Sequence, residues 1–188
     1  MALITLSIIT SIGDKKADTL KEPLFCSSFV ERIVGPFMPE SEDIVLKGSS
    51  EELQGSKARR ENTGRVPDLF LCVNMSDFNH AFFISEVKSL SYRRSDRRPS
   101  DPDFVKMVNE IKDGIDCMGN ISKECKTVYA LLVQGDRCRI FALDLQFYKL
   151  YRLNMLKQFY LPVDKFDMQR LDGCYSALSS LKVSKIIT

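Results

Sequence analysis

Stretches typical of β-strands stand on either side of an amphipathic helix in this chain, and their order constrains the fold most. Residues 66–75 and 81–88 are rich in β-branched and aromatic side chains, and the short gap between them predicts a hairpin. Residues 102–118 place apolar side chains at helical spacing. Two further strand-type stretches, 127–134 and 137–145, are joined by a tight turn. A hairpin, a helix and a second hairpin predict an α/β chain with a mixed sheet.

The amino-terminal third adds a helix, a short strand and a polar stretch. The helix is expected to begin near Pro23, because proline is tolerated in a first turn, and to end at Gly35. A short strand is expected at 44–46, and the polar residues 48–64 predict a mobile loop. The apolar residues 1–12 lack the basic start and clear cleavage site of a secretory signal, so a first strand or a partly ordered tail is expected.

The carboxy-terminal third extends the sheet. The aromatic-rich residues 147–160 are expected to continue it, and a last helix is expected over 163–181. Residues 1–188 are therefore predicted to form one domain, a mixed central β-sheet flanked by helices. The aromatic side chains of the late strands are expected in the sheet core: Phe141, Phe147, Tyr148, Tyr151, Phe159 and Tyr160.

The composition excludes several classes of protein. Of the 188 residues, 44% are apolar and 28% are charged, which are globular values and not those of a disordered or fibrous chain. No apolar stretch approaches the length of a membrane span, so no membrane partner is expected. The formal net charge is only +2, so any attraction to nucleic acid must come from local basic patches.

The cysteines indicate a reducing environment. The chain has six cysteines, without a C-x-x-C pair, and a single histidine, so a structural zinc site is not expected. Cys72 and Cys138 lie within apolar stretches and are predicted to be core residues. His80 falls in the predicted turn of the first hairpin, where an exposed side chain is expected. An intracellular location, nucleus or cytoplasm, is favoured, while secretion stays open.

Two carboxylates and a lysine are the strongest candidates for a functional site. Glu86 and Lys88 are two residues apart on a predicted strand, so their side chains point to the same face of the sheet. The strand paired with it begins at Asp68. Val87 is expected to point into the core, which leaves its backbone carbonyl as a further oxygen ligand. Charged groups at the end of a buried strand need a partner or a function.

These residue types suit hydrolysis of phosphodiester bonds with a divalent metal, Mg²⁺ or Mn²⁺. Mg²⁺ prefers a few carboxylates and waters in an octahedral shell. The metal would polarise the phosphate and lower the pKa of a bound water. Lys88 could orient or deprotonate that water, or balance charge in the transition state.

The residues Pro67-Asp68 followed by Glu86-x-Lys88 resemble the signature of the PD-(D/E)XK nuclease superfamily, and most closely its fungal nuclease-like proteins. The resemblance extends from Phe29 to about Val163, although Ser85 stands where those proteins carry glycine. It implies a restriction-endonuclease-like α-β-β-β-α-β core. It also implies site roles for individual residues: Asp68 and Glu86 as metal-binding carboxylates with the Val87 carbonyl, Lys88 as the catalytic lysine, and Glu31, or less directly Glu22, as an acidic residue on the first helix.

Basic residues flank this site on both sides. They could bind the phosphate backbone without sequence preference, and Tyr92 could stack on a base. The same residues also fit a nuclear-localisation signal. The predicted nucleic-acid-binding set is Lys57, Arg59, Arg60, Arg65, Tyr92, Arg93, Arg94, Arg97 and Arg98.

The sequence therefore favours a metal-dependent endonuclease acting on nucleic acid, DNA rather than RNA, with a homodimer as an open option. A second hypothesis is a catalytically inactive module of the same fold that binds nucleic acid or a protein partner. An effector- or toxin-like role is a third. All three use the same nuclease-like fold; loss of metal-dependent cleavage in a site variant would support the first, and binding without cleavage the second.

Overall fold

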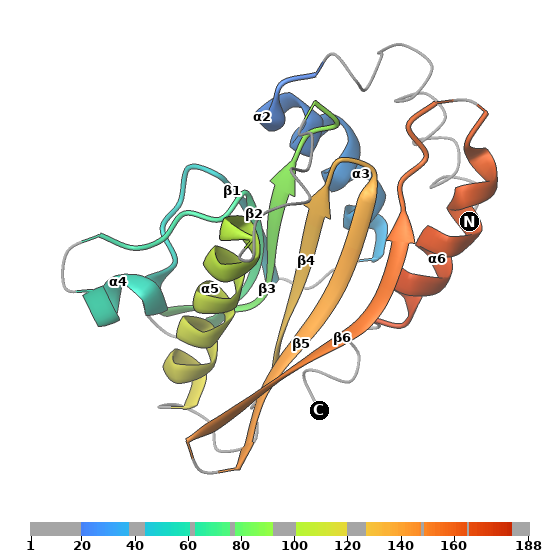
Figure 1. Ribbon diagram of the computed structural model, residues 1–188. Helices are drawn as coiled ribbons and strands as arrows, with labels where there is room; N and C mark the ends of the chain where they lie inside the picture. Colours follow the sequence, from blue (N-terminus) through green and yellow to red (C-terminus); the bar gives the residue numbers. More distant parts are fainter. Residues whose placement is uncertain are drawn as a thin grey trace.

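The computed structural model describes residues 20–37, 44–60, 63–75, 78–91, 101–119, 127–147, 149–164 and 166–181 (Figure 1). The strand or tail expected at 1–12 lies outside these residues. Within them, one six-stranded sheet runs in the order β1-β2-β3-β4-β5-β6. The strand bounds are β1 Ile44–Gly48, β2 Leu69–Met75, β3 Phe78–Lys88, β4 Thr127–Gln134, β5 Arg137–Phe147 and β6 Leu150–Tyr160.

The sheet is mixed because one of its strand pairs is parallel. β1, β2 and β3 form an antiparallel meander, as do β4, β5 and β6, while β3 and β4 pair in parallel. A parallel pair needs a crossover, and helix α5 (Pro102–Gly119) supplies it. The tight turn between β4 and β5 contains Gly135 with φ of 66°, a conformation that a residue with a side chain rarely adopts.

Helices cover both faces of the sheet. On one face lie α5 and the short α4 (Gln54–Arg60), and on the other lie the first helix and α6 (Leu171–Ser179), as Figure 1 shows. The first helix is continuous but irregular, with α-helical turns α2 (Glu22–Phe25) and α3 (Glu31–Val34) around a π-helical segment, Cys26–Val30. Short 3₁₀ turns follow it at Gly35–Phe37 and precede α6 at Met168–Arg170.

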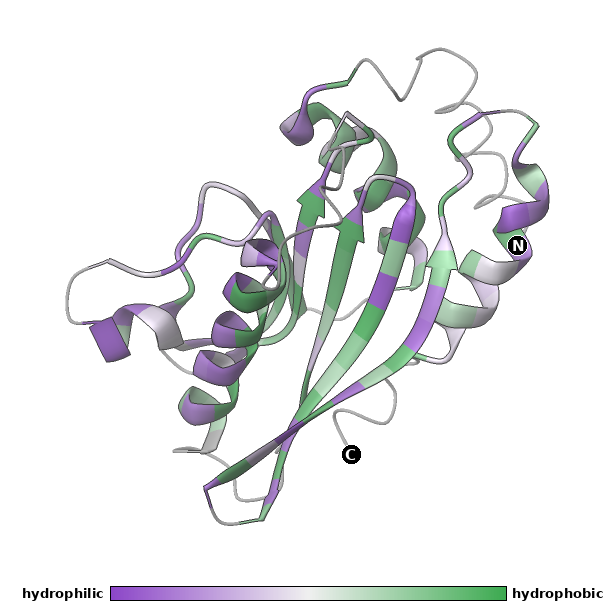
Figure 2. Cartoon of the chain, viewed as in Figure 1, coloured by the Kyte–Doolittle hydropathy of each residue, from purple (hydrophilic) through white to green (hydrophobic). Residues whose placement is uncertain are grey.

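Each face has its own apolar core. Phe25, Phe29 and Ile33 of the first helix pack on the sheet together with residues of α6 such as Leu178. Met107, Ile111 and Ile115 of α5 pack on the opposite face. Figure 2 shows the resulting pattern: β4, which is covered on both faces, is apolar along most of its length, whereas α5 is apolar only on one side. β3 and β4 are the central strands of this three-layer arrangement.

The expected fold class is confirmed: the chain is an α/β domain with a mixed sheet flanked by helices. The helix, three strands, helix and strand expected for the core occur in that order, with α4 inserted between β1 and β2. Cys72 and Cys138 are buried, as expected. No helix in the described ranges is both long and apolar enough to span a membrane.

The prediction of a loop over 48–64 was wrong for part of that stretch. Residues 54–60 form α4, and Gly48 ends β1. α4 is polar, so it shows little helical periodicity, and contacts with α5 hold it instead. Gly55 lies so close to α5 that a Cβ at this position would be 2.8 Å from Cys117 Cβ. The close approach of the two helices therefore depends on a residue without a side chain.

The expected position of His80 was also wrong. β3 begins at Phe78, so His80 lies in the strand opposite Val73 and is buried. Its Nδ1 is 3.6 Å from the Sγ of Cys117 on α5, and burial lowers the pKa of its imidazole. β3 begins three residues before the apolar stretch at 81–88, so the strand takes in residues that the sequence assigned to the gap between the stretches.

The late aromatic residues divide into two groups. Phe141 and Phe159 are core residues, as expected, and residues 150–160 do continue the sheet as β6. Phe147 and Tyr160 are exposed, which corrects the expectation for them. Phe147 is the last residue of β5, at the hairpin with β6. Tyr160 is the last residue of β6, at the opposite end of this strand pair, and its ring centroid lies 5.7 Å from the Arg170 guanidinium. Tyr151 is partly buried, and Tyr148 lies outside the described residues.

Candidate active site

The hairpin of β2 and β3 brings together the residues that the sequence singled out. Leu69, the first residue of β2, pairs with Ser85, so Asp68 lies beside the segment that carries Glu86 and Val87. Asp68 Oδ2 accepts a hydrogen bond of 2.7 Å from the Val87 N–H. The Val87 side chain points into the core on the first-helix side, as expected. Glu86 points the other way, towards α5, and its side chain is only 1% exposed.

Lys88 ends β3 and is held by carboxylates from two helices. Its Nζ donates a hydrogen bond of 2.7 Å to Glu22 on α2 and lies 3.9 Å from Asp103 on α5. Burial alone would lower the pKa of Lys88, but the hydrogen bond to Glu22 and the charge of Asp103 outweigh it, so the net pKa is raised. Lys88 is therefore a cation at neutral pH.

The acidic residue of the first helix that contacts Lys88 is Glu22, the alternative to Glu31. Glu31 begins α3, one π-helical segment further along, and it is partly buried. Both carboxylates act on the buried Cys26 between them: burial raises the pKa of this thiol to about 12, and the negative charges of Asp68, Glu31 and Glu22 add to the rise. π-helical segments of this kind occur often at functional sites.

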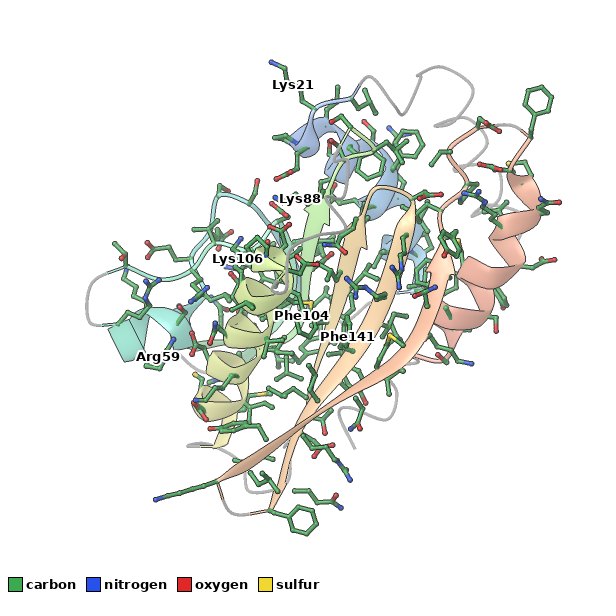
Figure 3. All side chains as sticks on the ribbon, viewed as in Figure 1. Lys21, Arg59, Lys88, Phe104, Lys106 and Phe141 are labelled. Atoms are coloured by element: carbon green, nitrogen blue, oxygen red, sulfur yellow. The ribbon has the colours of Figure 1, made fainter. Side chains whose placement is uncertain are left out.

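A second lysine, Lys106 on α5, lies against Glu86. Its Nζ is 2.7 Å from Glu86 Oε1 and 2.8 Å from Oε2, and it donates a hydrogen bond of 3.1 Å to the Val66 carbonyl. Glu110, one turn along α5, is 3.8 Å away. Lys88 at the end of β3 and Lys106 on α5 thus approach the same end of the hairpin from two elements (Figure 3).

Glu110 is the most unusual group of the site. Its side chain is fully buried; neither carboxyl oxygen makes a hydrogen bond of good geometry, and its polar neighbours include the Glu86 carboxyl group and the Lys106 ammonium. Burial raises its pKa from 4.5 to about 9, and the negative charge of Glu86 adds to this rise. Burial also raises the pKa of Glu86, although its contact with Lys106 opposes part of that effect. At neutral pH, Glu110 is thus a neutral acid beside the Glu86–Lys106 pair.

The predicted nucleic-acid-binding residues have different environments. Arg60 on α4 is exposed, and Lys57 is mostly exposed and 3.1 Å from Glu52. Arg59 makes an ion pair of 2.6 Å with Asp113, which is buried on α5, so it links the two helices. Arg65 is partly buried, and its charge acts on Glu110. The remaining predicted residues lie outside the described residues: Tyr92, Arg93, Arg94, Arg97 and Arg98.

The α5 residues of the site were missed in the sequence. Asp103, Lys106, Glu110 and Asp113 follow one another at intervals of three and four residues, so they form a charged stripe along the helix. This charged stripe runs beside the apolar stripe that identified the helix. Charged residues at helical spacing next to an apolar stripe usually indicate a solvated flank. Here these residues face β3 and α4. Only the tertiary structure distinguishes a charged stripe that packs against other elements from one that faces solvent.

The chemistry of these donors fits a hard divalent cation. Carboxylate and carbonyl oxygens are the ligands that Mg²⁺ and Mn²⁺ favour, and Asp68, Glu86 and the Val87 carbonyl offer them. The N–H and C=O of a strand residue point to the same side, so the Val87 carbonyl faces the side on which Asp68 lies. In the described parts of the chain, however, no three carboxylate, histidine or cysteine side chains are already arranged as a metal-ion cluster.

Comparison with known proteins identifies no relative. No protein-family model matches the chain, and neither a curated protein nor a solved structure is significantly similar to it. The site geometry is therefore the basis for a functional proposal.

Proposed function

We propose that this protein is a divalent-metal-dependent endonuclease that hydrolyses phosphodiester bonds of nucleic acid, DNA in preference to RNA. The observation that carries the proposal is Glu86, a carboxylate buried in a central strand two residues before Lys88 and next to Asp68. A buried charge is costly, and a chain that needed only stability would gain from an apolar residue at position 86. The residue types and their order resemble those expected of a metal-assisted hydrolase.

Asp68, Glu86 and the Val87 carbonyl would hold Mg²⁺ or Mn²⁺. The metal, when bound, would supply a polarised phosphate and a water of lowered pKa. The hydrogen bond from the Val87 N–H fixes the Asp68 carboxylate, so one oxygen is oriented while the other remains available. Glu86 is fixed by the packing of β3 between two layers. Both carboxylates are thus positioned by backbone elements rather than by loops.

Lys88 would stabilise negative charge on the phosphate in the transition state. Its raised pKa favours the ammonium form, so charge stabilisation suits it better than proton abstraction. Glu22 and Asp103 hold it from either side, which orients the ammonium at the end of β3. The exposed basic residues Lys57 and Arg60 on α4 would add affinity for the phosphate backbone.

A cleavage assay tests the proposal. The purified protein is incubated with labelled single- and double-stranded DNA and RNA, with Mg²⁺, with Mn²⁺ or with chelator. We expect cleavage that depends on metal and that is lost in Glu86→Gln, a variant that keeps the shape of the side chain. Glu51→Gln, at an exposed position, is the matched control and should cleave as the wild type does. Cleavage in chelator, or undiminished cleavage by Glu86→Gln, would contradict the mechanism.

A second candidate function is a nucleic-acid- or protein-binding module without catalysis. The observation in its favour is Lys106, whose ammonium lies against both oxygens of Glu86 and so neutralises the carboxylate without a metal. Such a module would bind nucleic acid with strong salt dependence but would release no product. Salt-sensitive binding with no cleavage under any metal condition would favour this function over the first.

A further inference from the structure

We propose that the Lys106 ammonium is a built-in cation that competes with the divalent metal for Glu86 and is displaced when metal binds. This inference rests on the proposed function, since it describes how the same site is regulated. It extends that function by assigning a role to Lys106, which lies outside the Asp68, Glu86 and Lys88 set. The role follows from the oxygen atoms around the ammonium, from the buried Glu110 carboxyl group that the ammonium does not satisfy, and from the exposure of the Lys106 side chain.

The surroundings of the Lys106 ammonium are those of a cation site. Oxygen atoms approach it from three elements: both carboxylate oxygens of Glu86 on β3, the carbonyl of Val66 before β2, and Glu110 on α5. The nearest lie at 2.7 and 2.8 Å. A hard metal ion is likewise surrounded by a shell of oxygen ligands. The ammonium and a metal bound to Glu86 would therefore need the same space.

Glu110 provides an independent sign that the cluster is adapted to a ligand. It is fully buried beside Glu86, and neither of its carboxyl oxygens makes a hydrogen bond of good geometry to Glu86 or Lys106. Buried polar atoms are nearly always paired, and an unpaired one in a native structure calls for an explanation. A metal with its water shell would supply partners that the Lys106 ammonium, at 3.8 Å, does not.

Lys106 can leave the site without disturbing the fold. Its side chain is 36% exposed, whereas Glu86 and Glu110 are 1% and 0% exposed. The side chain is a flexible four-carbon stem with a strongly hydrated end, so rotation into solvent needs no backbone change. The carboxylates, in contrast, are fixed on β3 and α5. A divalent ion and an ammonium a few ångströms apart would repel each other, so occupation by one excludes the other.

The first test uses the unaltered protein. Lysine side chains are modified with an amine-reactive reagent, with and without saturating Mn²⁺, and the modification of each lysine is followed by peptide mass spectrometry. We expect the modification rate of Lys106 to rise several-fold on Mn²⁺ binding. Lys112 is the internal reference: it lies on the same helix, is 38% exposed and pairs with Asp116 at 2.6 Å. Its rate should stay constant. An unchanged Lys106 rate in metal-saturated protein overturns the inference.

The second test measures Mn²⁺ affinity by calorimetry for the wild type, Lys106→Met and Lys112→Met. Removal of the competing charge should tighten Mn²⁺ binding to Lys106→Met by about tenfold or more, whereas Lys112→Met should match the wild type. Equal affinity in all three proteins overturns displacement but leaves the proposed function standing. If only Lys106→Met binds Mn²⁺, the result supports competition between the Lys106 ammonium and the metal, and it contradicts a metal-dependent wild-type enzyme. Absence of Mn²⁺ binding in every protein contradicts both.

Discussion

The two faces of the sheet have different chemistry. On the side of the first helix and α6, the contacts are made by apolar residues such as Phe25, Phe29 and Leu178. On the α5 side, an apolar core is accompanied by the charged stripe of Asp103, Lys106, Glu110 and Asp113. All the buried carboxylates of the described residues lie on this side: Glu86, Glu110 and Asp113.

This difference predicts which substitutions should affect stability and which should affect the proposed activity. Burial of apolar surface stabilises either face, but buried carboxylates cost free energy and need compensation. Lys106 compensates Glu86, and Arg59 compensates Asp113. Glu110 stays neutral because its pKa is raised. We therefore expect substitutions on the first-helix face to change stability, and substitutions at the charged stripe to change activity, pH dependence or metal binding.

The largest effect is expected for Phe29→Ala on the first-helix face. Phe29 is 1% exposed, and its truncation leaves a cavity that should cost about 3–5 kcal/mol. The melting temperature should fall by roughly 10 °C, as measured by calorimetry. Leu24→Ala on the same helix is the control, because Leu24 is 46% exposed and should matter little. Similar losses in both variants would show that the helix is not packed as described.

Lys88→Ala should separate activity from stability. If Lys88 stabilises charge on the phosphate, its removal should lower the rate of metal-dependent cleavage by about 10²–10³-fold. The melting temperature should change little, because the Glu22 partner is partly exposed and can be hydrated. Single-turnover cleavage rates and calorimetry measure the two effects. Lys112→Ala should alter neither, and a rate loss that merely followed unfolding of Lys88→Ala would contradict the assigned role.

Sequence periodicity predicted those elements whose structure depends on an apolar pattern. β4 was predicted with its observed bounds, and α5 to within one residue at its carboxyl end. The positions of Asp68, Glu86 and Lys88 could also be predicted, because a side chain's direction on a strand follows from the alternation of residues. Local patterns of this kind need no knowledge of distant contacts.

The remaining features depend on contacts between distant segments. α4 is a helix because Gly55 allows close packing on α5, and His80 is buried because β3 extends towards the turn. A π-helical segment separates Glu22 from Glu31 on the first helix, and it is Glu22 that contacts Lys88. The spacing of the charged stripe was visible in the sequence. Whether such residues face solvent or a neighbouring strand is decided by the packing of α5.

Glu110→Gln should change how stability depends on pH. The pKa of Glu110 is raised in the folded protein to about 9 from 4.5, so the folded state holds a proton that the unfolded state releases. The stability that the protonated Glu110 contributes to the folded state is fully present below about pH 4.5 and is lost as the pH rises through about 9. In urea titrations between these limits, the wild type should lose stability relative to Glu110→Gln, which cannot titrate. The control Glu51→Gln should parallel the wild type, and parallel curves for Glu110→Gln would exclude a raised pKa.

The smallest effect is expected for Arg59→Ala, at the far end of the charged stripe. Arg59 is half exposed, but its ion pair with the buried Asp113 links α4 to α5. Its loss should cost about 1–2 kcal/mol, because water can reach only part of the uncompensated carboxylate. Lys57→Ala, on the same helix but exposed, should leave stability unchanged. A double-mutant cycle with Asp113→Asn isolates the pair. If α4 contacts phosphates, Arg59→Ala and Lys57→Ala should both weaken nucleic-acid binding. If Arg59→Ala lowers stability but leaves binding unchanged, Arg59 stabilises the fold and the phosphate contacts belong to Lys57 and Arg60.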